Sequence, residues 1–451
     1  MNTLRYKSFK NFNPATLIFI ISGVFLIKNS EVQIIPITKL YKQKIYNHPI
    51  TQSLFKSAKS AKSAKSARPN PLTPLGNPPL YLYQFFSLKL SMIKYSFFLL
   101  VVLLFSCKEM ETPSNENTYF PPLIGTTWES LSPSSLGWNE NELEGLYDLL
   151  ESGNTRGFIV LKDGKIAIEK YFGTQLIGNQ PFNQNSIWYW ASAGKTLTAA
   201  LTGIAQQEGF INIQSPSSTY LGTAWTAATT SQENAITVWH QLTMTTGLDD
   251  GVNNRDNTSP ESLRYLAAPG TRWAYHNAPY TLLEQVISNA SNRNFTDYFN
   301  DKIASKIGMA GTWQKIDFNN VYFSNTRSMA RFGLLILRKG KWQNQEILSD
   351  KAFFEQMVST SQSINPAYGY LWWLNGKSPF MIPTLQSQFN GILIPNAPSD
   401  MIIAAGRDGQ FVCVVPSQNL VLIRMGLDTD DSLVSFIYLN QIWTALNQIL
   451  K

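Results

Sequence analysis

Ser192 and Lys195 are the residues of this 451-residue chain whose types and spacing first indicate chemistry. A serine and a lysine three positions apart at a helix start lie on one face, one turn apart, so their polar ends can approach hydrogen-bond distance. A serine hydroxyl needs a neighbouring base to attack a carbonyl, and a desolvated lysine can serve as that base. The helix N-terminus and the Ser192 N–H would stabilise the resulting oxyanion.

The Ser-x-x-Lys spacing alone is weak evidence for a catalytic pair, because the same spacing occurs at Ser53 with Lys56 and at Ser91 with Lys94. Only Ser192 opens a segment with helical apolar periodicity. A capped surface helix with a solvent-exposed lysine remains the alternative interpretation of the tetrad by itself. The G-x-S-x-G elbow of α/β-hydrolases is absent, since a tryptophan occupies the first glycine position.

Histidine and cysteine are too scarce for several other mechanisms. The chain has three histidines and two cysteines, Cys107 and Cys413, and contains no H-E-x-x-H motif. This composition argues against a zinc hydrolase, a multi-cysteine metal site and a disulfide framework, and we expect neither metal nor cofactor. A Ser-His-Asp triad would need His240 or His276. We expect His240 to be a helix residue. His276 stands between Tyr275 and Asn277, so we expect its side chain to point in a different direction from theirs.

A second motif lies 83 residues after Ser192, where Tyr275 and Asn277 follow a Pro-Gly turn and precede an apolar-periodic helix. With Ser-x-x-Lys at a helix start and Tyr-x-Asn after a Pro-Gly turn, the chain resembles the serine β-lactamase/penicillin-recognising superfamily. The resemblance is to its class C β-lactamase-like branch, which includes serine esterases, D-amino-acid peptidases and 6-aminohexanoate-dimer hydrolases. It spans roughly residues 131–451.

The resemblance implies a role for each matched residue. Ser192 is the nucleophile and Lys195 assists its deprotonation. Tyr275, as a phenolate or through a hydrogen bond to Lys195, passes the proton to the leaving group. A phenolate would need a lowered pKa, which Lys195 could supply by proximity. Asn277 would bind substrate or Lys195. The alternative for Tyr275 is a core aromatic residue with a satisfied hydroxyl.

The third motif of the family, Lys-Thr-Gly beside the serine, is replaced here by Gly406-Arg407-Asp408-Gly409-Gln410. This form resembles the esterase and oligomer-hydrolase relatives. The backbone of residues 407–410, with Gly409 and Gln410 as candidates, is expected to supply the second oxyanion donor. Arg407 either binds an anionic substrate group in place of the missing Lys-Thr pair or pairs with Asp408. A dedicated β-lactamase is therefore less expected.

The elements that must position these residues can be read from periodicity. Hairpins are predicted over 157–171, around Asp163-Gly164, and over 410–425. Helices are predicted over 139–151, 192–208, 232–245, 279–292, 327–338 and 432–450. We therefore expect an α/β (α+β) fold: an antiparallel β-sheet built from N- and C-terminal strands and flanked by helices, with a mostly helical insert at about 215–390, as in β-lactamases and transpeptidases.

The charge of the chain is divided unevenly. Residues 1–91 carry 13 Lys or Arg and one acid, a sum of +12, whereas the remainder carries 24 bases and 29 acids, a sum of −5. The overall +7 therefore does not indicate nucleic-acid binding, and we expect no nucleic-acid partner. A hydrophobic content of 44% indicates a globular protein.

Residues 1–91 form a low-complexity basic extension, with SAKSAKSAKSAR over 57–68, followed by a proline-rich stretch. We expect this extension to be disordered or to result from a start codon assigned too far upstream.

Residues 92–107 resemble a bacterial lipoprotein signal in which Cys107 is lipidated. They consist of a basic start, an apolar run and Ser106-Cys107, although Phe105 is larger than the residue usual at that position. Residues 108–130 read as a tether and 131–451 as the hydrolase domain. The alternative for 92–107 is a membrane anchor or buried strand.

These observations together predict a serine hydrolase, exported and lipid-anchored in the bacterial cell envelope, on its periplasmic or surface face. Its partners would be a small ester or amide substrate, cleaved through an acyl-enzyme on Ser192, and the membrane that holds the anchor. One alternative is a β-lactamase or D-Ala-D-Ala peptidase type of penicillin-recognising enzyme. Another is a non-catalytic binding or sensor protein on the same fold.

Overall fold

The computed structural model describes residues 24–28, 31–35, 118–429 and 433–451. The predicted lipoprotein signal with Cys107, most of the basic extension and the first part of the tether lie outside the described residues. Within the extension, β1 (Val24–Lys28) and β2 (Glu31–Ile35) pair antiparallel. No helix among the described residues is both long and apolar enough to cross a bilayer.

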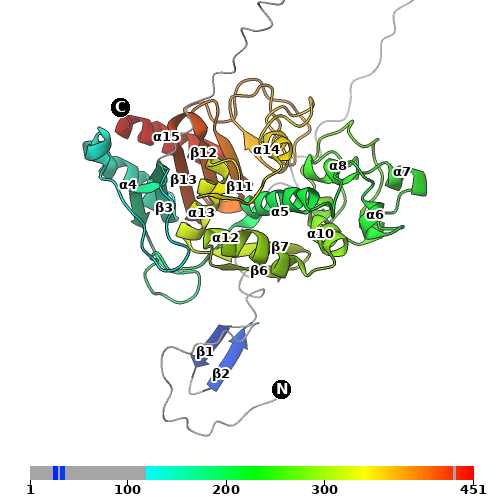
Figure 1. Cartoon of the computed structure of the whole chain (residues 1–451), viewed down its shortest axis with the longest axis horizontal. Coiled ribbons are helices and arrows are strands. Elements are labelled where there is room, and N and C mark those ends of the chain that lie inside the picture. Colours follow the sequence, from blue (N-terminus) through cyan, green and yellow to red (C-terminus); the bar gives the residue numbers. More distant parts are fainter. Residues whose placement is uncertain (1–23, 29–30, 36–117, 430–432) are drawn as a thin grey trace, which may run out of the picture. The chain divides into compact units, whose positions relative to one another are not determined.

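A six-stranded antiparallel sheet, built from both ends of the domain, forms its centre (Figure 1). Its strands in spatial order are β10 (Trp373–Leu374), β11 (Ile402–Gly406), β12 (Gln410–Val415), β13 (Leu420–Gly426), β3 (Thr155–Lys162) and β4 (Lys165–Tyr171). All residues of β11, β12 and β13 are buried, so both faces of the central strands are covered. The expected antiparallel sheet from N- and C-terminal strands is confirmed.

The hairpin between β3 and β4 forms where its turn residues predicted it. Asp163 and Gly164 both have positive φ, 50° and 83°, which is the backbone of a two-residue type I′ turn. The β12–β13 hairpin closes at Asn419, whose φ of 47° lets the chain reverse after the turn Pro416–Gln418. Short-range turn chemistry is therefore sufficient to set both hairpins.

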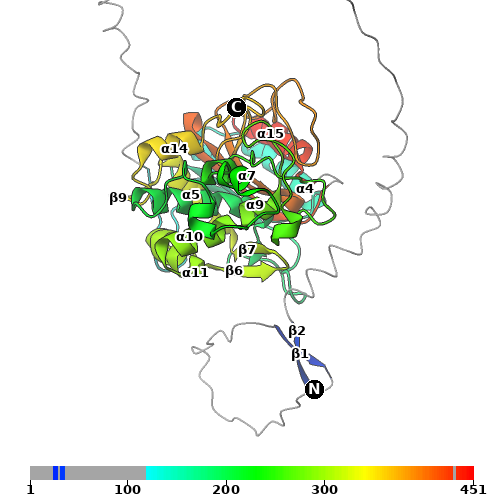
Figure 2. The ribbon, with the colours of Figure 1, turned by 90° about the vertical axis from the view of Figure 1, so that its right-hand side faces the viewer.

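Helices cover the sheet on both sides (Figure 2). The long helices are α4 (Leu143–Ser152), α5 (Lys195–Gln207), α10 (Leu283–Ser291), α13 (Thr326–Leu337), α14 (Lys351–Met357) and α15 (Phe436–Ile449). Helix α13 packs on β12, β13 and β3, although it falls inside the stretch 215–390. Helix α4 packs against α15 and on β3. In Figures 1 and 2, α4 and α15 lie together, on the opposite side of the domain from α5, α10 and α14.

The region between α5 and α13 consists mainly of short helices. They are α6 (Ser218–Leu221), α7 (Thr230–Asn234), α8 (Val238–Leu242), α9 (Asn277–Thr281), α11 (Phe295–Phe299), a π-helical turn (Asn300–Ala304) and α12 (Ser305–Ile307). Short 3₁₀ turns cover Pro133–Leu136, Glu140–Glu142, Pro260–Ser262 and Arg407–Gly409, and β8 (Lys341–Trp342) pairs with β9 (Gln345–Glu346).

One continuous helix predicted over 232–245 is wrong, because the chain forms α7 and α8 instead. Thr237 adopts an extended conformation, with φ −96° and ψ 165°, and its side chain accepts a hydrogen bond from the His240 N–H. The His240 ring Nδ1 in turn accepts from the Thr237 N–H at 3.0 Å. This reciprocal capping box starts a new helix at Val238. It depends on local side-chain hydrogen bonds, which the spacing of apolar residues does not predict.

A second, three-stranded sheet was not predicted from the sequence. It has the order β5 (Trp188–Tyr189), β7 (Asn319–Ser324) and β6 (Gly311–Ile316). The Trp190 N–H donates to the Tyr322 carbonyl at 2.9 Å, and the Trp190 indole donates to Ser324 Oγ at 2.7 Å. The segment that enters the 3₁₀ turn η4 (Ala191–Gly194), which holds Ser192, is thereby fixed to the hairpin β6–β7.

Arg424 of β13 joins three parts of the domain, although it is fully buried. Its guanidinium donates to the carbonyl oxygens of Gly153, Asp408, Gly409 and Leu427 and to Thr155 Oγ1. These acceptors lie where α4 ends and β3 begins, in the turn after β11 and at the end of β13. A planar group with five donors can satisfy them together, which a lysine cannot do.

Replacing Arg424 with methionine is expected to lower the free energy of unfolding by about 3 kcal/mol or more, because several buried acceptors lose their donor. Urea denaturation followed by tryptophan fluorescence measures this. The matched control is Arg338→Met at the partly exposed C-cap of α13, for which a change within about 0.5 kcal/mol is expected. Equal stability losses in the two variants would contradict the role given to Arg424.

Candidate active site

Ser192 is presented by a strained turn. The residue before it, Ala191, has φ +46°, a left-handed conformation that costs a non-glycine residue about 1 kcal/mol or more. Ser192 itself is partly exposed, whereas Ala193 and Gly194 behind it are buried. Such strain persists only where the surrounding structure over-determines the backbone. The turn therefore places the Ser192 hydroxyl at a surface while its neighbours anchor in the core.

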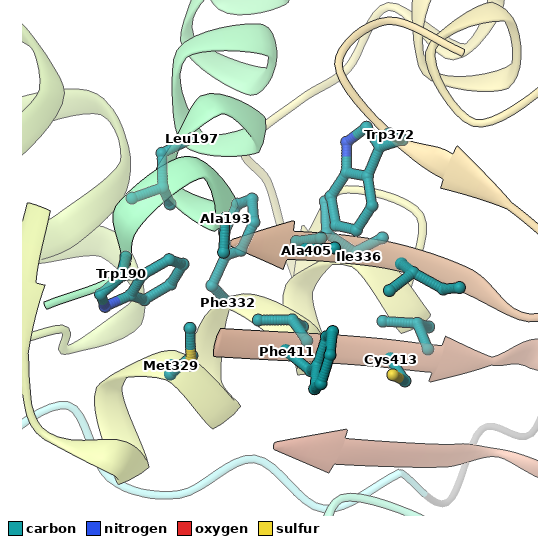
Figure 3. Packing of buried hydrophobic residues seen from close by; sticks show 14 of the residues in the cluster. Trp190, Ala193, Leu197, Met329, Phe332, Ile336, Trp372, Ala405, Phe411 and Cys413 are labelled. Atoms are coloured by element: carbon teal, nitrogen blue, oxygen red, sulfur yellow. The ribbon is translucent and has the colours of Figure 1, made fainter. Parts of the chain in front are cut away.

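The core that anchors Ser192 comes from three elements distant in sequence. Figure 3 shows Ala193 and Leu197 gathered with Phe332 of α13 and Ala405 of β11. Every residue of α5 from Lys195 to Ala205 is buried, which makes it a central helix. Gly203 allows α14 to approach, because a Cβ there would lie 2.4 Å from the Phe353 ring. The nucleophile segment is thus held from all sides except the one facing the cavity.

Lys195 is buried beside the serine. Its Nζ donates to Ser192 Oγ at 3.0 Å, and only 4% of the residue is exposed. The ring centroids of Tyr280 and Tyr275 lie 4.3 Å and 5.3 Å from the same nitrogen. Burial lowers the pKa of Lys195 to about 7, with the carboxylate of Asp256 acting in the opposite direction. A substantial fraction of Lys195 is therefore neutral near neutral pH and able to accept a proton.

Tyr275 is also buried, and its environment does not produce a phenolate. Burial raises the pKa of Tyr275 above its ordinary value, while a hydrogen bond with Ser192 acts to lower it. A phenolate base would require a lowered pKa of Tyr275, so the raised pKa is the opposite of what that role needs. The ring stacks on Trp373 at 6.0 Å between centroids, and Trp273 and Tyr368 pack against it. Tyr275 is thus a rigidly held neutral phenol adjacent to Ser192 and Lys195.

A cavity of about 560 Å³ opens beside these groups. Of the residues singled out from the sequence, five contribute to its wall: Ser192, Lys195, Tyr275, Asn277 and Arg407. A cavity of this size accommodates a small organic ligand. The structure therefore brings together, in one pocket, residues from the two motifs and from the turn after β11.

Gly409 and Gln410, which the sequence offered as candidate oxyanion residues, are not among the residues that line the cavity. Gln410 Nε2 donates to the Gly426 carbonyl at 2.7 Å, and its Oε1 accepts from the Gly426 N–H at 3.1 Å. Gly409, with φ +70°, lies against the Arg424 guanidinium. Both residues fasten the turn after β11 to β13, because this turn needs a left-handed backbone and a buried amide to close it.

The backbone beside Ser192 points to a different donor. A Cβ on Gly406 would lie 3.1 Å from Ser192 N and 2.9 Å from Ala193 N, so the end of β11 touches the nucleophile turn. The next residue, Arg407, lines the cavity. The Ser192 N–H belongs to the first turn of a helix, where amides have no intrahelical acceptor. The backbone amides of Ser192 and Arg407 are therefore the pair suited to an oxyanion.

Arg407 does not pair with Asp408. The Asp408 carboxylate accepts a hydrogen bond from the Tyr189 hydroxyl at 2.6 Å, and burial is the main cause that raises its pKa. No carboxylate of the described residues lies within ion-pair distance of Arg407. Of the two alternatives drawn from the sequence, the structure favours a guanidinium available to the cavity.

Asn277 bonds neither Lys195 nor Ser192 in the structure. Its Nδ2 donates to Asp256 Oδ1 at 2.7 Å, and Asn319 Nδ2 donates to Asp256 Oδ2 at 3.1 Å. Asp256 and Asn319 line the cavity but were missed in the sequence, since no motif spacing marks them. His276, the rival base, is buried outside the cavity wall, and burial lowers its pKa to about 4.

Comparison with known proteins agrees with this geometry. The profile of the family described as Beta-lactamase matches residues 148–426. The chain is 28% identical over 141 residues to a β-lactamase of Escherichia coli K12, covering 30% of this chain and 36% of that protein. It is 27% identical over 176 residues to the D-alanyl-D-alanine-carboxypeptidase/endopeptidase AmpH of the same strain, covering 36% of this chain and 46% of that protein. The matches thus span less than half the length of these curated relatives.

Solved structures share the fold. A Bacillus anthracis protein described as a 6-aminohexanoate-dimer hydrolase superposes with a TM-score of 0.53 and 16% identity, covering 73% of this chain and 89% of that chain. A penicillin-binding protein homologue from Caulobacter crescentus gives a TM-score of 0.54 with 11% identity, covering 71% and 99%. Because the family profile covers more than half of the chain and the Ser-x-x-Lys and Tyr-x-Asn residues meet in one cavity, the chain belongs to the Beta-lactamase family.

Proposed function

We propose that this protein is a serine hydrolase that cleaves a small ester or amide through an acyl-enzyme on Ser192. The observation that carries the proposal is the 3.0 Å hydrogen bond from Lys195 Nζ to Ser192 Oγ, made by a buried lysine at the wall of a cavity. Membership of the Beta-lactamase family supports a serine hydrolase in general. The roles of individual residues follow from the geometry of the site.

Acylation begins with the neutral form of Lys195. It accepts the Ser192 hydroxyl proton while Oγ attacks the substrate carbonyl carbon, and the carbonyl oxygen becomes an oxyanion. The backbone N–H groups of Ser192 and Arg407 would stabilise that oxyanion. The burial that lowers the pKa of Lys195 to about 7 is what supplies a base at neutral pH.

Collapse of the tetrahedral intermediate needs a proton for the leaving group. Tyr275 lines the cavity beside Ser192 and Lys195 as a neutral phenol, so it can donate its proton to the departing alcohol or amine and regain one from protonated Lys195. Water then attacks the acyl-enzyme with Lys195 again accepting the proton. The product acid leaves, and Ser192 recovers its hydrogen.

The alternative of a penicillin-recognising enzyme rests on relatives whose names include a β-lactamase and a D-alanyl-D-alanine carboxypeptidase. The strand beside Ser192 argues against it, because β11 ends Ala404-Ala405-Gly406 and has no lysine or threonine to hold a β-lactam carboxylate. Turnover of a chromogenic cephalosporin at the rate of a simple ester would favour this alternative. A non-catalytic sensor is disfavoured by the complete set of Ser192, Lys195 and Tyr275.

We also propose that the protein is exported and anchored to the bacterial cell envelope through lipid on Cys107. The support is the sequence of residues 92–107, a basic start and apolar run that end in Ser106-Cys107. A cavity of this size takes a small substrate, which can reach an enzyme in the cell envelope by diffusion.

Ser192→Ala is expected to abolish labelling by a fluorophosphonate probe and to lower ester hydrolysis by at least about 10³-fold, because the attacking oxygen is removed. In-gel fluorescence and initial rates measure the two effects. Ser305→Ala, on the exposed face of α12, is the control and should label like the wild type. Undiminished labelling of Ser192→Ala would refute the nucleophile.

The pH dependence of kcat/KM should follow the protonation of Lys195. Below pH 7 the lysine is mostly charged and cannot accept the serine proton, so the rate should fall about tenfold per pH unit; above pH 7 it should reach a plateau. No decline attributable to Tyr275 is expected below pH 10, because its pKa is raised. Stopped-flow acylation rates between pH 5 and pH 10 test this. A rise that continues to pH 10 would show an unperturbed lysine.

Growth of the natural source, or of a bacterial host that expresses the whole chain, with an alkyne fatty acid should label the processed protein at Cys107. Cys107→Ala should lose the label and leave the membrane fraction. Cys413→Ala is the matched control, since this thiol is fully buried in β12 and should not affect labelling. Equal labelling of the wild type and Cys107→Ala would exclude the anchor.

A further inference from the structure

A hydrogen bond joins the segment that carries Ser192 to the turn that carries Arg407. The Tyr189 hydroxyl donates to Asp408 Oδ2 at 2.6 Å. Tyr189 lies in β5, three residues before Ser192, and Asp408 directly follows Arg407. The bond therefore connects the two segments whose backbone N–H groups form the candidate oxyanion pair, although 219 residues separate its partners in the sequence.

Tyr189 is a fixed point from which the turn can be held. Only 4% of the residue is exposed, and its backbone pairs with Phe323 of β7. Its ring stacks on Trp188 at 5.3 Å between centroids, and the Phe323 ring lies at 6.3 Å. Because the backbone and the ring are both held, the hydroxyl has little freedom to follow a movement of Asp408. A displacement of the turn would therefore break the hydrogen bond.

Asp408 needs such support because its backbone is left-handed, with φ 64° and ψ 20°. This conformation is disfavoured for a residue with a Cβ, although aspartate tolerates it better than most residues. Burial raises the pKa of its carboxyl group, and the hydrogen bond from Tyr189 acts to lower it. A carboxylate withdrawn from water in this way would be left without a hydrogen-bond donor if the tyrosine hydroxyl moved away, which is unfavourable.

The other contacts of the turn hold it from a different side. The Arg424 guanidinium donates to the Asp408 carbonyl, and this bond fixes the turn to β13. The end of β11 touches the Ser192 turn at Gly406. A van der Waals contact of this kind limits how closely two segments approach, but it resists their separation only weakly. The hydrogen bond from Tyr189 supplies the resistance to separation.

We propose that Tyr189 and Asp408 are positioning residues that hold the Arg407 N–H where it can act with the Ser192 N–H on an oxyanion. The proposal rests on the proposed function, since it assumes an acyl-enzyme on Ser192. Neither Tyr189 nor Asp408 lines the cavity, so both act through the backbone of Arg407. Displaced donors lose much of their effect on the developing charge, because this stabilisation depends on a fixed geometry. Loss of the bond should therefore slow formation of the tetrahedral intermediate.

The experiment compares 4-nitrophenyl butyrate with its thiono analogue, in which sulfur replaces the carbonyl oxygen. Sulfur is larger and accepts hydrogen bonds more weakly, so two well-placed N–H groups favour the oxygen ester. The kcat/KM of each compound reports acylation, the step that forms the first oxyanion, and nitrophenolate release is followed by absorbance. We expect the wild type to favour the oxygen ester by about a hundredfold or more. Equal rates in the wild type would overturn the proposal.

Two single variants and their combination test the pair. Tyr189→Phe removes the donor and keeps the ring, whereas Asp408→Gly removes the acceptor and relieves the left-handed backbone. Each should lower the oxygen-to-sulfur ratio about tenfold, and the double variant should lower it little further, since both changes remove the same bond. Wild-type ratios in both single variants would overturn the proposal, as would fully additive losses in the double variant.

A conservative variant should rescue the ratio. The amide oxygen of Asp408→Asn can still accept from the Tyr189 hydroxyl, and asparagine also tolerates a left-handed backbone. We expect this variant to keep the oxygen-to-sulfur ratio within about threefold of the wild type. A loss as large as that of Asp408→Gly would contradict the role given to the hydrogen bond.

The matched control is Tyr298→Phe, which removes another hydrogen bond between a buried tyrosine and a carboxylate. The Tyr298 hydroxyl donates to Glu208 Oε2 at 2.7 Å, and neither residue lines the cavity. Urea denaturation should show a loss of stability comparable to that of Tyr189→Phe, while the oxygen-to-sulfur ratio stays at the wild-type value. An equal fall of the ratio in both variants would overturn the proposal, because the ratio would then follow stability rather than the turn.

Fluorophosphonate labelling of each protein separates the possible failures. A wild type that is not labelled at Ser192 would refute the proposed function and the inference with it. A labelled wild type whose oxygen preference survives in Tyr189→Phe and Asp408→Gly would overturn the role of the pair alone. Should Tyr189→Phe not fold, a folded Asp408→Gly protein with the wild-type ratio would overturn the inference equally.

Discussion

The hydrogen bond between the buried Lys195 Nζ and Ser192 Oγ is the interaction on which the site depends. A lysine in the first turn of an exposed helix would remain charged at neutral pH and could not act as a base. Here α5 packs against α10, α14 and the π-helical turn Asn300–Ala304, and the aromatic rings of Tyr275 and Tyr280 lie over Nζ. The helix that carries the motif must therefore be buried along most of its length, as α5 is from Lys195 to Ala205, and burying the lysine costs stability that the large core offsets.

The second requirement is a close approach between β11 and the nucleophile turn. Gly406 has no side chain, and this lets the strand end reach the amides of Ser192 and Ala193. The turn that follows is held by Gln410 and by Arg424, whose guanidinium binds carbonyls from three parts of the chain. Residues that bear no catalytic chemistry thus decide where the Arg407 amide lies. This explains why Gly409 and Gln410, adjacent in sequence to the site, are structural.

The cavity has three features that bear on the choice of substrate. Its β11 strand lacks the Lys-Thr pair, Arg407 is free of an ion pair with Asp408, and Asn277 is committed to Asp256. Side-chain amides and guanidinium groups line the cavity together and make it polar. Membership of the family fixes the fold, and the substrate depends on the residues of the site.

Local signals in the sequence determined the hairpins, most long helices and the Ser-x-x-Lys and Tyr-x-Asn motifs, because turn chemistry and apolar periodicity act over a few residues. Periodicity did not reveal the capping box at Thr237 or the sheet β5–β7–β6, since β5 and β7 pair across more than 130 residues. Apolar periodicity also does not predict the protonation states of Lys195 and Tyr275. The neutral phenol of Tyr275, the lowered pKa of Lys195 and the orientation of Asn277 by Asp256 arise from burial and from contacts between distant segments, which only the tertiary structure decides.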